Sequence, residues 1–187
     1  MAGIKGNRRT LYTKMIIRES LIKLLKEKEI HKITVTDICK EADINRGTFY
    51  AHYNDPFDLL EKMEDDFFEK VMEYLNENSH NQDTITALTK IFEMARENKD
   101  FCKILLNNVG DDKILKRILY IANQDNINIL RSNLNDQNRN FIEYLTCFAV
   151  NGAVGIIEAW IKNDFQEDPK VLATLITTIA LKLKELS

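Results

Sequence analysis

Side chains suited to nucleic-acid recognition gather in one short stretch of the sequence, Arg46-Gly-Thr-Phe-Tyr-Ala-His52. On a helix, Phe49 faces the core and leaves its polar neighbours outward. An arginine can bond guanine through two parallel hydrogen bonds, a threonine can contact base edges, and tyrosine or histidine can bond phosphate. A glycine lets the helix approach a groove closely. The outward residues predicted to enter a major groove are Arg46, Gly47, Thr48, Tyr50 and His52.

Two short helices joined by a tight turn are predicted to position this stretch. Either Thr34 or Thr36 can cap the first helix through its hydroxyl. Asp43 tolerates a left-handed backbone in the turn, and Asn45 can cap the second helix. The apolar positions that pack this pair inward are Ile38, Ala42 and Ile44. The pattern is typical of a helix-turn-helix that reads DNA.

Positive charge is concentrated in residues 1–54, which hold 11 Lys and Arg against 6 Asp and Glu. Residues 55–187 hold 15 basic against 23 acidic side chains, and the whole chain carries −3, which argues against general coating of nucleic acid. The basic residues before the first acidic one are Lys5, Arg8, Arg9, Lys14 and Arg18. Because clustered cations follow phosphates, Arg8 and Arg9 are predicted to contact the DNA backbone, with a solvated charged face as the alternative.

The segment from Ile33 to Tyr53, followed by Asp58-Leu-Leu60, resembles the DNA-binding domain of TetR-type transcriptional regulators. The motif combines a Thr-initiated helix, a turn, the Gly-Thr-Phe-Tyr core, a following aromatic residue and the start of a long helix. The resemblance implies a three-helix DNA-binding domain. It adds Thr36, Asn45 and Tyr53 to the predicted DNA contacts, with Thr36 and Tyr53 on phosphates.

Two positions depart from the pattern of that family. The turn usually carries glycine where this chain has Asp43, and a lysine that contacts phosphate is usual where it has Pro56. Pro56 suits the first position of a helix, with Asp55 as its N-cap. Whether Asn54 or Lys62 replaces the lost phosphate contact is left open.

The rest of the chain reads as helix after helix, because apolar residues recur at three-and-four spacing and only 6 Gly and 2 Pro interrupt them. Long helices are predicted over about 56–76, 138–163 and 169–186, with shorter ones between. We therefore expect an all-α fold of about nine helices. Residues 1–54 form the DNA-binding domain, and residues 55–187 form a helical domain for dimerisation and effector binding.

Two stripes on the last two predicted helices favour a homodimer. A row of small residues with one isoleucine would let another helix come close, and the final helix carries an apolar row. The predicted dimerisation residues are Gly152, Gly155, Ile156, Ala159, Leu172, Ile176, Ile179 and Leu183. Packing inside one protomer is the alternative. A dimer also suits the predicted DNA-binding domain, because two recognition helices related by a two-fold axis read a palindromic operator.

The run from Phe148 to Ile161, with Pro169 after a polar turn, resembles the C-terminal region of a TetR branch that includes activators of dihydroxyacetone kinase operons. TetR-like proteins often hold an inducer among their middle helices, so a small-molecule effector is a further expected partner. The candidate effector-binding residues are Phe92, Phe101, Tyr120, Tyr144 and Phe148, with core packing as the alternative for each. Trp160 is expected to fill the core.

No catalytic residue, metal site or cofactor is predicted. The motif Glu77-x-x-His80 lacks the second copy that a helical di-metal site needs, and the sequence has no phosphate loop or nucleophile elbow. Three widely spaced cysteines, Cys39, Cys102 and Cys147, favour reduced thiols within apolar helices. With no signal pattern and no run of about 18 apolar residues, we expect a cytoplasmic protein without a membrane partner.

The sequence as a whole predicts a TetR-like, homodimeric transcriptional regulator rather than an enzyme. It binds double-stranded DNA at a palindromic operator, and repression relieved by a small-molecule effector is the favoured form of control. The alternative is a dimeric helical adaptor that has lost specific operator binding, which Pro56 in place of lysine motivates.

Overall fold

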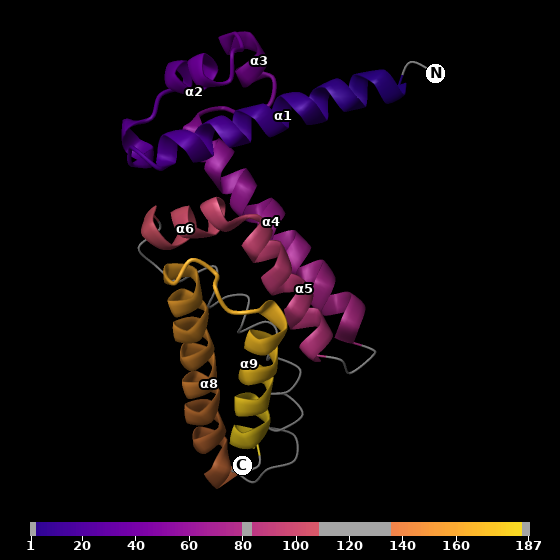
Figure 1. Ribbon diagram of the computed structural model, residues 1–187, viewed down its shortest axis with the longest axis vertical. Coiled ribbons are helices and arrows are strands. Elements are labelled where there is room, and N and C mark those ends of the chain that lie inside the picture. The colour runs from indigo at the N-terminus through magenta and orange to yellow at the C-terminus, as the bar shows by residue number, and fades with distance from the viewer. Residues whose placement is uncertain (1–2, 80–83, 109–135, 185–187) are drawn as a thin grey trace. The chain divides into compact units, whose positions relative to one another are not determined.

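The computed structural model describes residues 3–79, 84–108 and 136–184 (Figure 1). Within these ranges the chain forms eight α-helices and one 3-10 turn and contains no strand, which confirms the predicted all-α fold and lies close to the nine helices expected. One of the shorter helices predicted between the long ones carries Ile114 and Ile121, and it falls outside the described residues.

The chain divides into two compact units, Met1–Phe67 and Phe68–Ser187. The division falls inside a long helix, whereas the domain boundary predicted from the sequence precedes that helix and stays a prediction. The first unit holds α1 (Gly3–Leu25), η1 (Ile30–Lys32), α2 (Val35–Glu41), α3 (Arg46–Tyr50) and the start of α4 (Pro56–Ser79). The second holds the remainder of α4, α5 (Thr84–Glu97), α6 (Lys99–Asn108), α8 (Asp136–Lys162) and α9 (Pro169–Lys184).

The core of the first unit takes one apolar face from each of its α-helices. Its fully buried side chains are Ile17, Leu21, Ile38, Phe49 and Leu59. Burying a side chain of this kind contributes about 1.5–3 kcal/mol, so these few contacts hold the short helices in place. At the surface, Lys23 Nζ lies 3.1 Å from Glu41 Oε1 and joins α1 to α2.

An aromatic cluster anchors the core of the second unit. Trp160 is 2% exposed, its ring centroid lies 5.6 Å from that of Phe92 and 4.7 Å from that of Phe165, and its Nε1 donates to the Glu167 carbonyl at 3.0 Å. The expectation that Trp160 packs in the core is confirmed. Because this cluster joins α5, α8 and the turn after α8, it fixes where α9 begins.

The turn between α8 and α9 has two consecutive residues in left-handed conformation. Asp164 and Phe165 have φ of 56° and 59°, and the Phe165 amide donates to the Trp160 carbonyl at 2.9 Å. A left-handed residue just after a helix lets its amide close the last open carbonyls. Asp168 Oδ1 then accepts from the Lys170 amide at 2.9 Å and caps α9.

The cysteines lie in different surroundings. Cys39 and Cys102 are buried, and burial raises the pKa of the Cys102 thiol to about 12 and that of Cys39 above its ordinary value. Cys147 is exposed, so the expectation of three thiols within apolar surroundings is corrected at this position. A helix that has apolar residues on several sides does not reveal from sequence which of them face inward.

Candidate nucleic-acid interface

A capping box starts α2. The Asp37 amide donates to Thr34 Oγ1 at 3.2 Å, and the Thr34 amide donates to Asp37 Oδ2 at 2.9 Å. These bonds, first the one from the Thr34 backbone, lower the pKa of Asp37 below its ordinary value of 3.8. Thr34 is therefore the cap, and Thr36 is left exposed one residue into the helix.

The turn between α2 and α3 has the predicted backbone. Asp43 has φ of 51° and is exposed, and the Ile44 amide donates to the Cys39 carbonyl at 3.0 Å to close the end of α2. Aspartate tolerates the left-handed region better than most residues that carry a side chain. The prediction for Asp43 is confirmed, while Ile44 is half-buried rather than a core residue.

Asn45 caps α3, as predicted. Its Oδ1 accepts from the Thr48 amide at 2.8 Å and from Thr48 Oγ1 at 3.2 Å. A Cβ at Gly47 would lie 3.2 Å from the same Asn45 oxygen, so glycine leaves this cap room. Phe49 is fully buried and holds the helix against the core. The cap and the anchor fix the orientation of a helix only five residues long.

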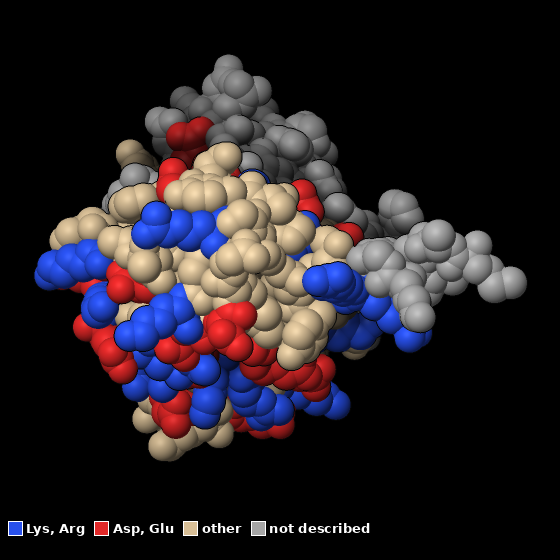
Figure 2. All heavy atoms as spheres, turned by 90° about the horizontal axis from the view of Figure 1, so that it is seen from above, with Lys and Arg blue, Asp and Glu red and all other residues tan. Residues whose placement is uncertain are grey.

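The outward face of α3 is polar and open. Arg46 and Gly47 are exposed, Tyr50 is 57% exposed, and Thr48 and His52 are half-buried. Figure 2 views the molecule from the side where α2 and α3 lie, and shows uncharged surface flanked by Lys and Arg side chains, with Asp and Glu side chains among them. Such a face offers hydrogen-bonding groups to base edges, with cations around it for phosphates.

Arg46 has a partner on the neighbouring helix. Its Nη2 donates to Thr36 Oγ1 at 2.6 Å, so two residues ten positions apart meet on one exposed surface. A hydroxyl that accepts from a guanidinium limits the directions in which the remaining N–H groups point. The structure therefore brings together two predicted DNA contacts, one from α2 and one from α3.

Tyr53 lies inside the unit rather than on its surface. The residue is 3% exposed, its ring centroid lies 5.8 Å from that of Phe49, and its hydroxyl accepts from Arg18 Nε at 3.3 Å. This burial leaves almost no surface for a phosphate. The role predicted for Tyr53 is corrected accordingly, and we assign the residue to packing behind α3.

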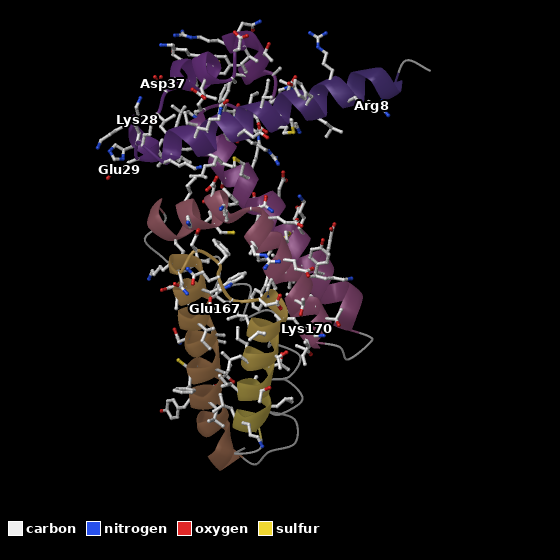
Figure 3. The ribbon with its side chains drawn as sticks, viewed as in Figure 1. Arg8, Lys28, Glu29, Asp37, Glu167 and Lys170 are labelled. Atoms are coloured by element: carbon white, nitrogen blue, oxygen red, sulfur yellow. The ribbon has the colours of Figure 1, made fainter. Side chains whose placement is uncertain are left out.

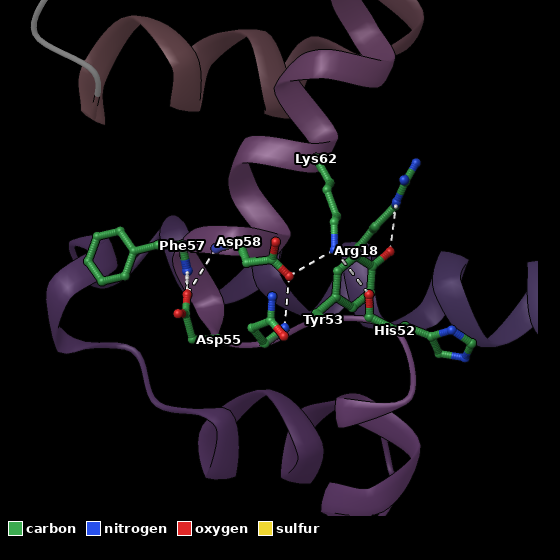
Figure 4. Close-up of polar contacts among 8 residues, drawn as sticks. Arg18, His52, Tyr53, Asp55, Phe57, Asp58 and Lys62 are labelled. Carbon is green, nitrogen blue, oxygen red and sulfur yellow. Dashed lines mark hydrogen bonds and ion pairs between the residues drawn. The ribbon is translucent and has the colours of Figure 1, made fainter.

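The start of α4 satisfies its own backbone donors (Figure 4). Asp55 Oδ1 accepts from the amides of Phe57 and Asp58 at 2.8 and 2.9 Å, and Asp58 Oδ2 accepts from the Asn54 amide at 2.7 Å. Pro56 has no amide hydrogen to offer. Asp55 is thus the predicted N-cap, and these amides of the first turn already have carboxylate partners.

Four charged residues of α1 and α4 lie around Tyr53, and Asp66 is the one among them that no sequence pattern indicated. Arg18 of α1 forms an ion pair with Asp66 of α4, and Lys62 Nζ lies 2.9 Å from Asp58 Oδ2. The spacing of Asp58 and Lys62, four residues apart on a helix, is a signal that could have indicated their pairing. No comparable signal links Arg18 with Asp66, because 48 residues separate them.

The predicted phosphate contacts of the amino-terminal helix are exposed. Arg8 and Arg9 both lie on α1 with open side chains, and Arg8 is near its amino end, whereas Lys28 and Glu29 lie beyond its other end (Figure 3). The Arg9 carbonyl accepts from Thr13 Oγ1 at 2.9 Å within the helix. Both guanidinium groups are therefore accessible to an anionic partner.

The predicted dimerisation residues fall into two groups. Gly152, Gly155 and Ala159 are exposed on α8, and Ile179 is 38% exposed on α9. Those that face inward wholly or in part are Ile156, Leu172, Ile176 and Leu183. Leu172 is 5% exposed, so it packs within its own protomer, which corrects its assignment to an interface.

The exposed apolar row of α9 shares only Ile179 with the predicted row. It consists of Val171, Leu175 and Ile179, exposed by 62%, 47% and 38%. On α9, apolar residues surround most of the helix, so periodicity alone fits more than one face. The structure selects the face that packs against the rest of the unit and leaves its neighbour open.

The effector candidates also separate. Phe92 and Phe101 are buried, whereas Tyr144 and Phe148 are 73% and 64% exposed on α8. Tyr120 lies outside the described residues. Side chains as open as Tyr144 and Phe148 do not line an enclosed pocket in one protomer, which corrects the expectation for these two residues. Within the described ranges, no three His, Cys, Asp or Glu side chains are grouped to hold a metal ion.

Comparison with known proteins identifies both parts of the chain. Residues 17–63 match the model of the tetR family of bacterial regulatory proteins, and residues 82–182 match that of a TetR-type transcriptional regulator C-terminal region. An uncharacterised HTH-type transcriptional regulator, YxbF of Bacillus subtilis (strain 168), is 27% identical over 97 residues. That match covers 49% of this chain and 26% of the relative, so the chain spans about a quarter of the length of that relative.

Solved structures share the fold over almost the whole chain. A TetR transcriptional regulator from Streptococcus agalactiae 2603V has a TM-score of 0.61 at 23% identity and covers 95% of this chain and 98% of its own. The dihydroxyacetone kinase operon activator DhaS has a TM-score of 0.60 at 20% identity, covering 94% and 98%. With a matching family model over more than half of its length, this chain belongs to the TetR family of transcriptional regulators.

Proposed function

We propose that this TetR-family protein is a homodimeric regulator that binds a palindromic operator through α2 and α3. The observation that carries the proposal is the exposed face of α3, where Asn45 fixes the helix start and Thr36 holds the guanidinium of Arg46. Polar groups fixed before binding lose little conformational freedom when they meet DNA. A short helix held in this way is suited to a major groove.

The contacts divide between sequence readout and backbone attraction. Arg46 reads a guanine, Thr48 and Tyr50 contact neighbouring base edges, and Arg8 and Arg9 neutralise phosphates from α1. The exposure of Arg46, Tyr50, Arg8 and Arg9 supports these roles, while Thr48 is half-buried beside them. A base contact discriminates between sequences, whereas a phosphate contact raises the affinity for all of them.

The dimer forms through the open face of α8 and the exposed row of α9. Along α8, Tyr144, Phe148, Gly152, Gly155 and Ala159 follow each other at spacings of three and four, and all five are exposed. Two large rings beside three small residues offer a partner helix both knobs and a close approach. Val171, Leu175 and Ile179 add apolar surface on α9.

The composition of α8 supports a covered face. Its segment Glu143–Lys162 has a mean hydropathy of 1.4, enough by length and composition to cross a membrane, and 33% of that segment is buried within the protomer. Helices inside a bundle have the same composition. A second copy of the α8 face would cover the remainder, which is why we place the dimer interface there.

Regulation follows from the spacing of the two DNA-binding domains in the dimer. A bound dimer blocks transcription where its operator overlaps a promoter, and a small-molecule effector relieves repression if it prefers a dimer whose readers do not match the operator. Phe92 and Phe101 remain the effector candidates on α5 and α6, both buried in the second unit.

Selection of duplexes from a random library by the purified protein, at near-physiological salt, tests the proposal. We expect the enriched pool to contain an inverted repeat whose half-sites lie roughly 34 Å apart along the duplex. Enrichment of a single, unrepeated site would contradict operator binding by a homodimer. A pool indistinguishable from the input, with or without cell extract as a source of effector, would contradict operator binding.

The second candidate function is a helical adaptor that keeps the dimer but not the operator. The closed start of α4 favours it, because Asp55 and Asp58 occupy donors that could otherwise face a phosphate. An adaptor would show no preference among duplexes and only weak, salt-sensitive binding. Competition between specific and random duplexes at fixed salt separates the two functions.

A further inference from the structure

The end of α3 is held from behind by a lysine of α4. The last residues after α3 turn back on the helix, since the amides of His52 and Tyr53 both donate to the Phe49 carbonyl, at 2.9 and 3.0 Å. The His52 carbonyl then accepts from Lys62 Nζ at 3.4 Å. A cation at the carboxyl end of a helix is favourable, because the last carbonyls carry partial negative charge.

The ammonium group of Lys62 has three partners inside the unit. Besides the His52 carbonyl, it contacts Asp58 Oδ2 at 2.9 Å and lies 5.5 Å from the centre of the Tyr53 ring. Asp58 in turn accepts from the Asn54 amide at 2.7 Å. These contacts span the connection between α3 and α4 and hold it closed (Figure 4).

Tyr53 links the same connection to α1. Its ring is buried against Phe49, and its hydroxyl accepts from Arg18 Nε, whose guanidinium also pairs with Asp66. One cation therefore lies over the face of the ring and another bonds its hydroxyl. Because Phe49 is the buried anchor of α3, whatever fixes Tyr53 also restricts how α3 tilts.

We propose that Lys62 is a positioning residue for the recognition helix, fixing the tilt of α3 through the His52 carbonyl and the Tyr53 ring, and is not a phosphate contact. The inference rests on the proposed operator binding. The contacts on which it is based do not depend on DNA, because all three partners of Lys62 belong to the first unit of the protein itself. Lys62 thus acts on the base contacts of Arg46 and Thr48 without touching DNA.

The test compares Lys62→Met and Lys62→Arg with Lys70→Met, an exposed lysine further along α4 whose loss changes the net charge equally. For Lys62→Met we expect about a three- to ten-fold loss of operator affinity, the range for losing a half-exposed charged hydrogen bond. Binding to random duplexes and the salt slope should stay at wild-type values. Lys62→Arg should restore most of the loss, and Lys70→Met should show none.

A phosphate role gives the opposite pattern and overturns the proposal. Affinity would then fall alike for all sequences, and the salt slope would drop by about one per protomer. Equal losses for Lys62→Met and Lys70→Met would also overturn it, since only net charge would matter.

Amide hydrogen exchange of the DNA-free protein judges the inference separately from operator binding. Loss of the Lys62 contacts should speed exchange at Ala51, His52 and Tyr53, with slower amides of α1 unchanged. Unchanged exchange there would overturn the positioning role even if the protein binds its operator. If the wild type selects no operator, the proposed function fails, and faster exchange still assigns Lys62 to holding α3.

Discussion

In the first unit, polar side chains at the start of α3 are exposed but have hydrogen-bond partners within the unit. In the second unit, the exposed face of α8 carries aromatic rings beside exposed glycines. Asn45 and Arg46 are held by hydrogen bonds of 2.8 and 2.6 Å. At Gly152 and Gly155, by contrast, an added Cβ would meet nothing within 4 Å beyond the adjoining backbone of its own helix. The first surface is prepared for a polar partner, and the second leaves room for an apolar one.

The two surfaces therefore call for opposite substitutions. In the first unit, removing a side chain deletes an existing hydrogen bond, and the position that this bond holds is lost with it. In the second, adding a side chain fills space that is empty in one protomer, so the change is felt only when a partner is present.

The largest effect is expected from Gly155→Leu. The protomer should fold at least as well as the wild type, because glycine inside a helix costs roughly 0.5–1 kcal/mol relative to alanine and a Cβ at this position meets open space. The dimer should dissociate. Operator affinity should then fall by a factor of about 10²–10⁴, which is the gain from joining two DNA-binding domains. Sedimentation equilibrium and an operator titration measure the two quantities.

Two further variants sharpen that result. Gly155→Ala adds one methyl group and should have a small effect on the dimer. Leu172→Ala removes a side chain that is 5% exposed, so it should destabilise the protomer itself by about 2–5 kcal/mol. A Gly155→Leu protein that remains a dimer with full operator affinity would remove α8 from the interface.

Arg46→Ala is the next largest change, and it tests the first unit. It should cost about 1–3 kcal/mol at one base pair of each half-site and relax the preference there. Arg9→Ala should instead weaken binding to all sequences and reduce the salt slope by about one per protomer. Titrations of single-base operator variants at several salt concentrations distinguish the two. Equal losses on every duplex would show that Arg46 contacts the backbone.

Asn45→Ala should lower the free energy of unfolding by about 1 kcal/mol, because the Thr48 amide loses its cap. Asn45→Asp keeps an acceptor at the same position and should preserve most of that stability. Chemical denaturation followed by circular dichroism measures both variants. If alanine is as stable as the wild type, the cap contributes nothing to holding α3.

The smallest expected effect is a pH dependence at Asp37. Hydrogen bonds from Thr34 lower the pKa of this carboxyl in the folded state, so its stabilising contribution is present above the ordinary value of 3.8 and is lost as the pH falls through the lowered value. Asp37→Asn should therefore lose less stability than the wild type between about pH 5 and about pH 2. Parallel acid titrations of unfolding free energy would contradict this assignment.

The sequence predicts the first unit well because its signals are local. The cap at Asn45, the left-handed Asp43, the inward Phe49 and the cap of Asp55 before Pro56 each depend on neighbours within a few residues. Local hydrogen bonding and backbone preference decide such features before the rest of the chain is placed. The structure confirms all four.

Features that depend on tertiary contacts are where sequence reasoning fell short. Burial of Tyr53 and the pairing of Arg18 with Asp66 join segments far apart in the chain. Exposure of Tyr144 depends on which side of an apolar helix finds a neighbour within the protomer. Periodicity shows that a helix has an apolar side, but the packing of the other helices selects the side that is buried.

Operator titration against half-site spacing tests the central claim most directly. Duplexes carrying the two selected half-sites, separated by their natural spacing or by insertions of about 2, 5 and 10 base pairs, would be titrated with the dimer. A rigid pair of readers predicts a sharp affinity maximum at the natural spacing and a large loss when half a helical turn moves one site to the opposite face. Affinity independent of spacing, or equal to that of a single half-site, would contradict a homodimer that reads a palindrome.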